Sequence, residues 1–199
     1  MRIHSDKTSE KFRKYIIGFK IKNITYYAIW GTDMTNEDFD FLVLNNNNSI
    51  ICSMNIKTLK DYLKSNINGQ VDSKNLYNWL KYHKAKKAYT IYDLDRLKSI
   101  FSERKYLFEK IGKRKRELIF NFVTVFSDYI QQIKNEEFQK ILKQKLMQNL
   151  FYEIGADYVN IDLQEKKNIA KNNLNSEYIL MNINLMINFL AKSLKRIDN

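Results

Sequence analysis

The hydrophobic period of this sequence changes once, near Asn55, from about two residues to about 3.6. The first pattern is typical of strands and the second of amphipathic helices. The chain has no proline and five glycines, and no proline- or glycine-rich linker separates the two patterns. We therefore expect one α+β domain over residues 1–199, sheet-rich over 10–55 and mainly helical over 56–199. In this arrangement a small N-terminal antiparallel sheet packs on a larger helical C-terminal body. A two-lobed arrangement divided near Gly112 is the alternative.

Four runs rich in β-branched and aromatic residues predict strands in the first part of the chain. They are KYIIGFKI (14–21), ITYYAIWG (24–31), FDFLVL (39–44) and SIICS (49–53). Asn45–Asn48 suit a hairpin loop, because asparagine tolerates left-handed backbone conformations. We expect an antiparallel meander, with residues 88–92 as one more strand. Within the second run, alternation places Tyr27 on the face opposite to Trp30.

Apolar stripes at helical spacing follow Asn55. The stripes are Ile56, Leu59, Leu63; Leu76, Trp79, Leu80; Leu94, Leu97, Ile100, Phe101; Leu118, Phe122, Val125, Phe126, Tyr129, Ile133; Phe138, Ile141, Leu142, Leu146, Leu150, Ile154; and Ile179, Ile183, Ile187, Leu190, Leu194. The expected N-terminal residues or caps are Asn55, Asp72 or Ser73, Asp93 and Ser176. The fifth stripe is expected to stop at Gly155, and Asp162 with Glu165 has capping-box spacing for a short polar helix.

The residues that most enzyme sites use are scarce in this chain. Its two histidines, His4 and His83, and its one cysteine, Cys52, do not gather into a reaction centre. His83 lies beside Tyr82 and Lys84, as in a metal-independent nuclease, but adjacent residues on a helix point in different directions. We expect Cys52 to be a small buried hydrophobic residue within a strand. The sequence therefore favours a binding protein over an enzyme, and a nuclease ranks last.

The chain carries a formal net charge of +12, and residues 54–111 hold thirteen basic and six acidic residues. Such an excess is typical of a protein that meets nucleic acid or an acidic partner, although lysine-rich genome composition also raises it. A single cysteine indicates a reducing compartment. The N-terminus lacks the apolar run of a signal peptide, and the longest apolar stretch, 178–191, is interrupted by asparagines. We expect a cytoplasmic protein without a membrane span.

Two basic stretches are candidates for a binding surface. Lys81–Lys87 interleaves cations with an aromatic and a histidine, and Lys113–Arg116 contains arginines, which pair well with phosphate or carboxylate. Positive charge at the expected start of a helix opposes the helix dipole, which slightly favours an interaction role for the second stretch. A solvated helix end or turn is the alternative for both. The candidate partner-binding residues are Lys84, Lys86, Lys87, Arg114 and Arg116.

An acidic stretch between the second and third expected strands is the other candidate contact surface. It contains Asp33, Glu37, Asp38 and Asp40. Divalent-metal loops usually combine denser carboxylates with a glycine at the turn, so a contact with a partner protein is expected rather than a metal site. Nothing in the sequence indicates a cofactor.

Three segments together resemble a family. They are YYAIWG, FDFLVL and SIICSMNIKTLKDYL in the N-terminal part; NLYNWLK (75–81) followed by IYDLDRLKSIF (91–101); and ELIFNFVTVFSDYIQQI (117–133). In this order they resemble the immunity proteins of bacterial contact-dependent growth inhibition and related polymorphic-toxin systems. The resemblance covers about two thirds of the chain and consists of hydrophobic patterns.

The resemblance implies a cytoplasmic, non-enzymatic protein that binds the C-terminal domain of a cognate toxin, often a nuclease, and blocks its active site. Nuclease inhibitors are commonly acidic, whereas this chain is basic. Either the acidic stretch from Asp33 to Asp40 makes the contact, or the toxin presents an acidic surface to Lys81–Lys87 or Lys113–Arg116. The alternative function is that of a basic nucleic-acid-binding protein, such as a phage or plasmid regulator.

Overall fold

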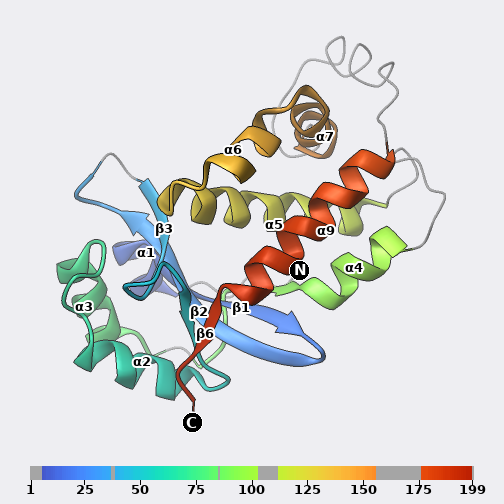
Figure 1. Cartoon of the computed structure of the whole chain (residues 1–199). Helices are drawn as coiled ribbons and strands as arrows, with labels where there is room; N and C mark the ends of the chain where they lie inside the picture. The colour runs from blue at the N-terminus through green and yellow to red at the C-terminus, as the bar shows by residue number, and fades with distance from the viewer. Residues whose placement is uncertain (1–5, 37–38, 85, 103–111, 156–175, 199) are drawn as a thin grey trace. The chain divides into compact units, whose positions relative to one another are not determined.

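The computed structural model describes residues 6–36, 39–84, 86–102, 112–155 and 176–198 (Figure 1). The chain divides into two compact units, one formed by residues 1–95 with 191–199 and the other by residues 96–190. The first unit is thus built from both ends of the sequence. The expectation of a single domain stays a prediction.

The first unit contains a four-stranded sheet in the described part of the chain, with the order β3, β2, β1, β5. The strands are β1 (Lys14–Ile21), β2 (Ile24–Asp33), β3 (Phe39–Leu42) and β5 (Thr90–Asp93). β2 pairs antiparallel with β1 and with β3, as expected. β5 pairs with β1 in parallel, so the prediction of a purely antiparallel sheet is wrong at this edge. A parallel neighbour needs a long crossover connection, and the helices between β4 and β5 supply it.

The asparagine run forms the predicted hairpin turn. Leu44 bridges Ile50 in antiparallel fashion, and Asn48 has a φ of 59°. However, the strand that follows, β4 (Ile50–Cys52), does not continue a meander. It pairs in parallel with β6 (Leu194–Arg196), while the next residue, Ser53, bridges Tyr27 of β2 (Figure 1).

The last predicted helical stripe is one residue too long. The final helix, α9, spans Ser176–Lys192 and begins where it was expected to begin. Leu194, which was assigned to its apolar stripe, instead opens β6. A three-residue strand paired with a segment more than a hundred residues away leaves no local periodic signal.

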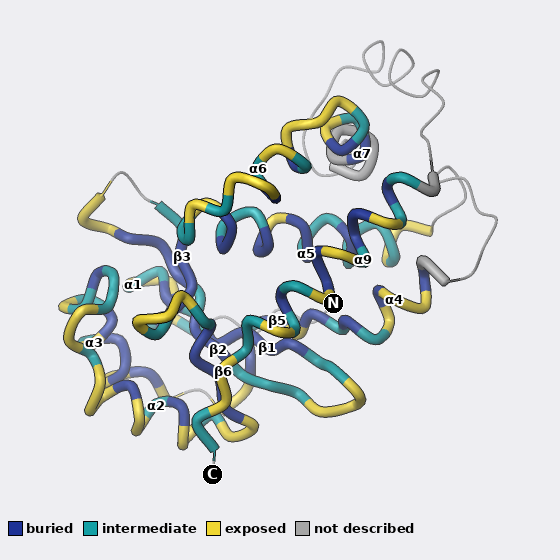
Figure 2. Tube along the Cα trace, in the orientation of Figure 1, coloured by how far each residue is buried: buried dark blue, intermediate teal, exposed yellow. Residues whose placement is uncertain are grey.

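Among the described residues, three helices belong wholly to the first unit. They are α1 (Lys7–Phe12), α2 (Ile56–Ser65) and α3 (Ser73–Tyr82). The predicted cap Asn55 accepts hydrogen bonds from the backbone N–H groups of Lys57 and Thr58. Each of α2 and α3 buries one side and exposes the other (Figure 2). Their buried sides form a core with one face of the sheet, made of Ile16, Ile29, Phe41, Val43, Ile51, Leu59, Leu63, Leu76, Trp79, Leu80 and Ala88.

A buried ion pair joins the start of β1 to the start of α3. Lys14 Nζ lies 2.8 Å from Asp72 Oδ2, and both side chains are fully buried. The Lys14 ammonium also donates to the carbonyl oxygens of Phe12 and Thr32. Gly31 lies opposite Lys14 in the β1–β2 pairing, and a Cβ there would lie 2.4 Å from the Lys14 Cδ atom. Glycine at this position therefore makes the room that the buried lysine needs.

The second unit is helical in its described part. Its helices are α4 (Leu94–Ser102), which begins in the first unit, α5 (Lys113–Gln132), α6 (Glu136–Lys143), α7 (Lys145–Gly155) and most of α9. The predicted stripe of α5 is buried at Phe122, Val125, Phe126 and Tyr129. The stripe from Phe138 to Ile154 is not one helix, because the backbone of Gln144 is extended and separates α6 from α7.

Aromatic side chains connect the helices of the second unit. The ring of Phe126 lies 5.2 Å from that of Phe138 and 6.3 Å from that of Phe189, between ring centroids. α7 ends at Gly155 as predicted, whereas the capping box at Asp162 and Glu165 lies outside the described residues. The α+β class, with an N-terminal sheet and mainly helical C-terminal part, is confirmed.

Candidate partner-binding site

The first unit contains a basic pocket of about 600 Å³, which we call the lysine pocket. The residues that line it are Tyr27, Met54, Asn55, Ile56, Lys57, Lys60, Asp61, Lys64, Lys84 and Lys86. Five lysines and one aspartate give this lining a formal charge of 5 − 1 = +4. A concave surface with one dominant sign of charge attracts anionic groups.

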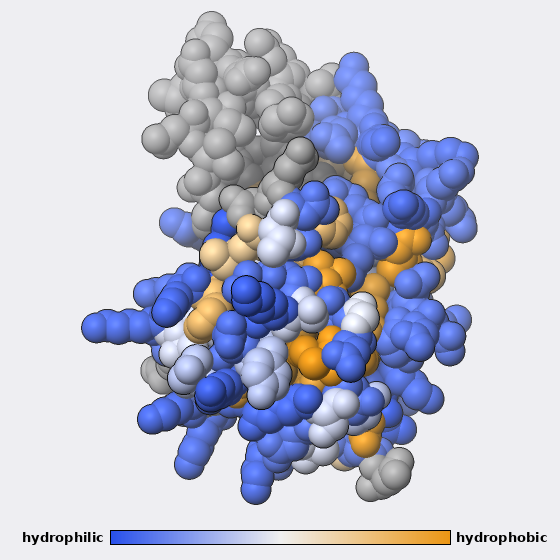
Figure 3. Space-filling view, turned by 90° about the vertical axis from the view of Figure 1, so that its left-hand side faces the viewer, coloured by the Kyte–Doolittle hydropathy of each residue, from blue (hydrophilic) through white to orange (hydrophobic). Residues whose placement is uncertain are grey.

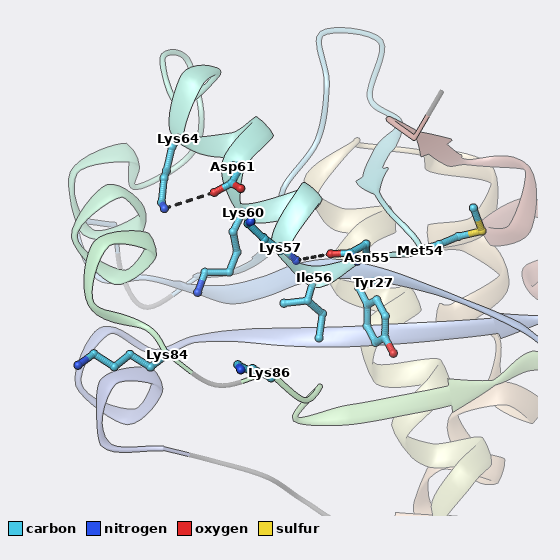
Figure 4. Close-up of a pocket in the computed structure, with 10 residues that line it drawn as sticks. All are labelled: Tyr27, Met54, Asn55, Ile56, Lys57, Lys60, Asp61, Lys64, Lys84 and Lys86. Atoms are coloured by element: carbon cyan, nitrogen blue, oxygen red, sulfur yellow. Dashed lines mark hydrogen bonds and ion pairs between the residues drawn. The ribbon is translucent and has the colours of Figure 1, made fainter.

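The lysines come from two segments that face each other across the pocket (Figure 4). Lys57, Lys60 and Lys64 project from α2, at spacings of three and four residues that place them on one side of the helix. Lys84 and Lys86 follow the end of α3, and Ile56 lies between the two sets with Tyr27 beside it. The pocket is therefore basic at its walls and apolar between them.

Lys60 holds the two walls of the pocket together. Its Nζ atom donates a hydrogen bond to the carbonyl oxygen of His83, which is the C-cap of α3. The same ammonium lies 3.4 Å from His83 Nδ1. Burial and the positive charge of nearby Lys64 lower the pKa of Lys60. Lys60 is thus the most engaged of the pocket's lysines.

His83 lies behind the pocket rather than in its lining. Its ring is stacked 4.4 Å from the Trp79 ring, and Nε2 lies 3.0 Å from Asp6 Oδ2, the cap of α1. Burial, reinforced by Lys60, lowers the pKa of His83 from 6.5 to about 4. The imidazole is therefore neutral at pH 7 and serves as a hydrogen-bonded spacer between three helices.

The sequence identified two of the five lysines of this site. Lys84 and Lys86 line the pocket, whereas Lys87 is exposed but lies outside its lining. Sequence reasoning missed the three lysines of α2. Their spacing of three and four residues, which places three cations on one side of a short helix, carries the signal.

The arginines of the second basic stretch belong to the other unit. They lie in the first turn of α5, which begins directly after Gly112 as predicted. Arg114 is exposed and Arg116 is half-buried. They form a separate basic surface from the lysine pocket.

The acidic stretch is partly turned inward. Asp33 is buried, and its carboxylate accepts hydrogen bonds from the backbone N–H and the hydroxyl of Thr35. Asp40 is half-buried and accepts a hydrogen bond from the hydroxyl of Thr32. Glu37 and Asp38 lie outside the described residues. Asp33 and Asp40 thus stabilise their own loop and strand, which leaves less acidic surface for a partner than the sequence indicated.

A second pocket of about 530 Å³ is neutral. It is lined by Asn45, Asn46, Asn47, Ile51, Tyr62, Ser65, Asn66, Asn68 and Gln70. Several of its amides are already used within the fold: Asn45 Oδ1 accepts from Ser49 N, and Gln70 Nε2 donates to the carbonyl of Leu44. Its polar groups mainly stabilise the adjoining turn.

The one cysteine of the chain, Cys52, has a structural role. Cys52 is buried in β4, as predicted, and burial raises the pKa of its thiol to about 12. Within the described residues, no three histidine, cysteine or acidic side chains are grouped as metal ligands would be. No described helix combines the length and apolarity that crossing a membrane requires.

The surface seen in Figure 3 is dominated by hydrophilic side chains, with apolar ones emerging in small areas between them. The exposed apolar residues of the described chain include Met54 at the lysine pocket. Methionine is among the residues that are enriched at protein–protein interfaces, whereas lysine is depleted there.

No protein-family model matches this chain, and no curated protein is significantly similar to it in sequence. One solved structure shares its fold: the C-terminal domain of SatS, crystallised in complex with bromine. The two chains superpose with a TM-score of 0.62 over 96% of this chain and 98% of that domain, at 10% sequence identity. At this identity the similarity concerns the fold alone.

Proposed function

We propose that this protein is an immunity protein, which binds a cognate toxin domain and neutralises it by covering its active site. The toxin is proposed to be a nuclease, as in the family that the sequence resembles. The observation that carries the proposal is the lysine pocket, which brings five lysines together beside apolar side chains at the surface. Inhibition of this kind needs complementary shape and charge over an interface of roughly 1,600 Å², and no catalytic group.

The sequence suggested two ways in which this protein could contact a toxin, through its acidic stretch or through its lysines, and the structure supports the second. Asp33 and Asp40 are engaged within their own loop and strand, whereas Lys84 and Lys86 project into an open pocket. An acidic surface on the toxin, gripped by lysines, therefore fits better than an acidic surface on this chain.

Nucleic-acid binding is the rival function, and the same lysines support it. Its interfaces usually add arginines and stacked aromatic rings to the lysines. The described lining contains no arginine and one aromatic residue, Tyr27. The mixed lining therefore favours a protein partner.

The test is to look for a toxin-like C-terminal domain encoded beside this gene and to co-express the two; the lack of such a neighbour would count against the proposal. We expect host survival and a stable one-to-one complex in size-exclusion chromatography with light scattering. A toxin domain of unrelated sequence serves as the specificity control and should still kill the host. Cell death despite expression of the folded protein would overturn the proposal. Tight retention of RNA, weakening steeply with salt, would support the nucleic-acid function instead.

A further inference from the structure

The lysines of α2 are arranged at a cost to the helix. Lys57, Lys60 and Lys64 share one side of α2, and like charges at these spacings destabilise a helix. Lys57 also lies in the first turn, where the helix dipole disfavours positive charge. Asp61 is the one described carboxylate in the lining, so the pocket's own residues do not balance this charge.

Two of the five lysines are engaged within the fold. Lys60 donates to the His83 carbonyl, and Lys64 Nζ lies 3.5 Å from Asp61 Oδ1. Among the described residues, none forms a hydrogen bond or ion pair with the side chains of Lys57, Lys84 and Lys86. These three ammonium groups are therefore available to a ligand.

Apolar groups lie beside the available cations in the lining of the lysine pocket. Met54 is 47% exposed, and Tyr27 and Ile56 are half-buried beside it. Carboxylates alone would leave this surface in contact with water, whereas an apolar side chain between them would cover it. A pocket of about 600 Å³ has room for such a side chain together with its neighbours.

We infer that the lysine pocket binds an acidic peptide segment whose carboxylates pair with Lys57, Lys84 and Lys86 and whose apolar side chain packs on Tyr27, Met54 and Ile56. The inference rests on the proposed function in one respect, because it assigns the segment to the toxin. Lys60 is a positioning residue in this site: its hydrogen bond to His83 sets the distance between α2 and the lysines that follow α3.

Three labelled decapeptides test this assignment by fluorescence anisotropy. One repeats Glu-Asp-Leu-Asp-Glu, the second replaces its acidic residues by Gln and Asn, and the third replaces leucine by glycine. A polyuridylate 12-mer is the nucleic-acid probe. We expect saturable binding of the first peptide, weaker binding of the third by about threefold or more, and no saturable binding of the second.

Two triple variants with equal charge change locate the binding. The pocket variant is Lys57→Gln/Lys84→Gln/Lys86→Gln, and the control variant changes the exposed residues Lys74, Lys98 and Lys140 to Gln. We expect about tenfold weaker binding of the acidic peptide to the pocket variant and less than twofold change for the control. Circular dichroism verifies folding, and Lys84→Gln alone is the fallback if the triple variant unfolds.

Three outcomes would overturn the inference: no saturable binding of the acidic peptide, equal losses in the pocket and control variants, or tighter binding of the RNA than of the peptide through the same lysines. Failure here with intact rescue by the wild-type protein would mean that the toxin docks elsewhere. Peptide binding without rescue would leave the pocket assigned and remove the immunity function.

Discussion

The first unit uses lysine side chains in two opposite ways: Lys14 is a buried ion-pair partner, whereas the lysines of the lysine pocket lie at the surface. Lys14 is fully buried, with its ammonium surrounded by Asp72 Oδ2 and two backbone carbonyls. Lys57, Lys84 and Lys86 are exposed, and no described residue pairs with them. The formal charge of +12 counts these lysines alike. What distinguishes a structural cation from one that is available to a partner is its set of neighbours.

Breaking the buried pair should produce the largest effect. In Lys14→Met the carboxylate of Asp72 stays buried without its counter-charge, and we expect a loss of about 3–5 kcal/mol of unfolding free energy. Asp72→Asn should cost a similar amount. The double variant should recover part of the loss, because it leaves no unpaired charge in the core. Urea denaturation of the four proteins measures these values.

The matched control is the partly exposed pair of Lys20 and Asp93. Its Nζ and Oδ2 atoms lie 3.2 Å apart, with side chains that are 32% and 27% exposed. Lys20→Met should cost less than about 1 kcal/mol, because water screens the pair. Equal costs at Lys14 and Lys20 would break the distinction between structural and available cations.

Protonation of His83 should lower the unfolding free energy in acid. The expected loss lies between those expected for Lys14→Met and Lys20→Met. Its pKa is about 4 in the folded protein and near 6.5 when unfolded, so the unfolded state binds more protons between these values. Stability should therefore fall as pH decreases from 7.5 to 5, by about 2 kcal/mol. The groups that face the ring are Asp6, Lys60 and Trp79.

The variant His83→Gln isolates this contribution. It removes the titrating group while keeping a side-chain donor that can reach the Asp6 carboxylate. We expect a flatter dependence of the melting temperature on pH between 7.5 and 5 than in the wild type. The same slope in both proteins would show that another group causes the acid sensitivity.

The sequence predicted correctly those features of the fold that depend on residues close together in the chain. Asn55 caps α2, the asparagine run turns the hairpin, and the apolar face of α2 is buried where Leu59 and Leu63 recur at helical spacing. In each case the physical cause lies within a few residues of the feature. For the site, the same reasoning found Lys84 and Lys86, which stand in a visible basic run.

Contacts between distant segments were not predicted. One such contact is the pairing of β6 with β4. Another is the ion pair of Lys14 with Asp72, because no residue near Lys14 or near Asp72 in the sequence marks the two as partners. Asp72 or Ser73 was expected to cap α3; Asp72 occupies the N-cap position, but its side chain makes no capping hydrogen bond and pairs with Lys14 instead. Likewise, α2 contributes to the pocket only because α3 folds back beside it.

The C-terminal contact predicts a smaller effect on stability. Asp198 accepts hydrogen bonds from the hydroxyl of Ser53 and from the backbone N–H of Met54, at 2.5 and 2.6 Å. Asp198→Ala should lower the unfolding free energy by about 1 kcal/mol, because water can replace the carboxylate at the exposed Met54 N–H, and the buried Ser53 hydroxyl can still donate to the carbonyl oxygen of Asn55. Asp198→Asn, which keeps one acceptor oxygen, is the control and should lose less. Thermal denaturation at pH 7 measures both, and an unchanged melting temperature in Asp198→Ala would contradict a stabilising role for this contact.

The smallest expected effect on stability is also the most informative about function. Neutralising Lys57, Lys84 and Lys86 should change the unfolding free energy by less than about 0.5 kcal/mol, and a gain is expected rather than a loss. The physical reason is that these cations have no described partner to lose, while Lys57 repels the other lysines of α2 and opposes the helix dipole. Urea denaturation at low and high salt measures the change, and screening should reduce the gain. A loss above about 1 kcal/mol would place these lysines with Lys14 among the structural cations. A neutral or stabilising result, combined with weaker partner binding, is what separates a surface kept for recognition from one kept for folding.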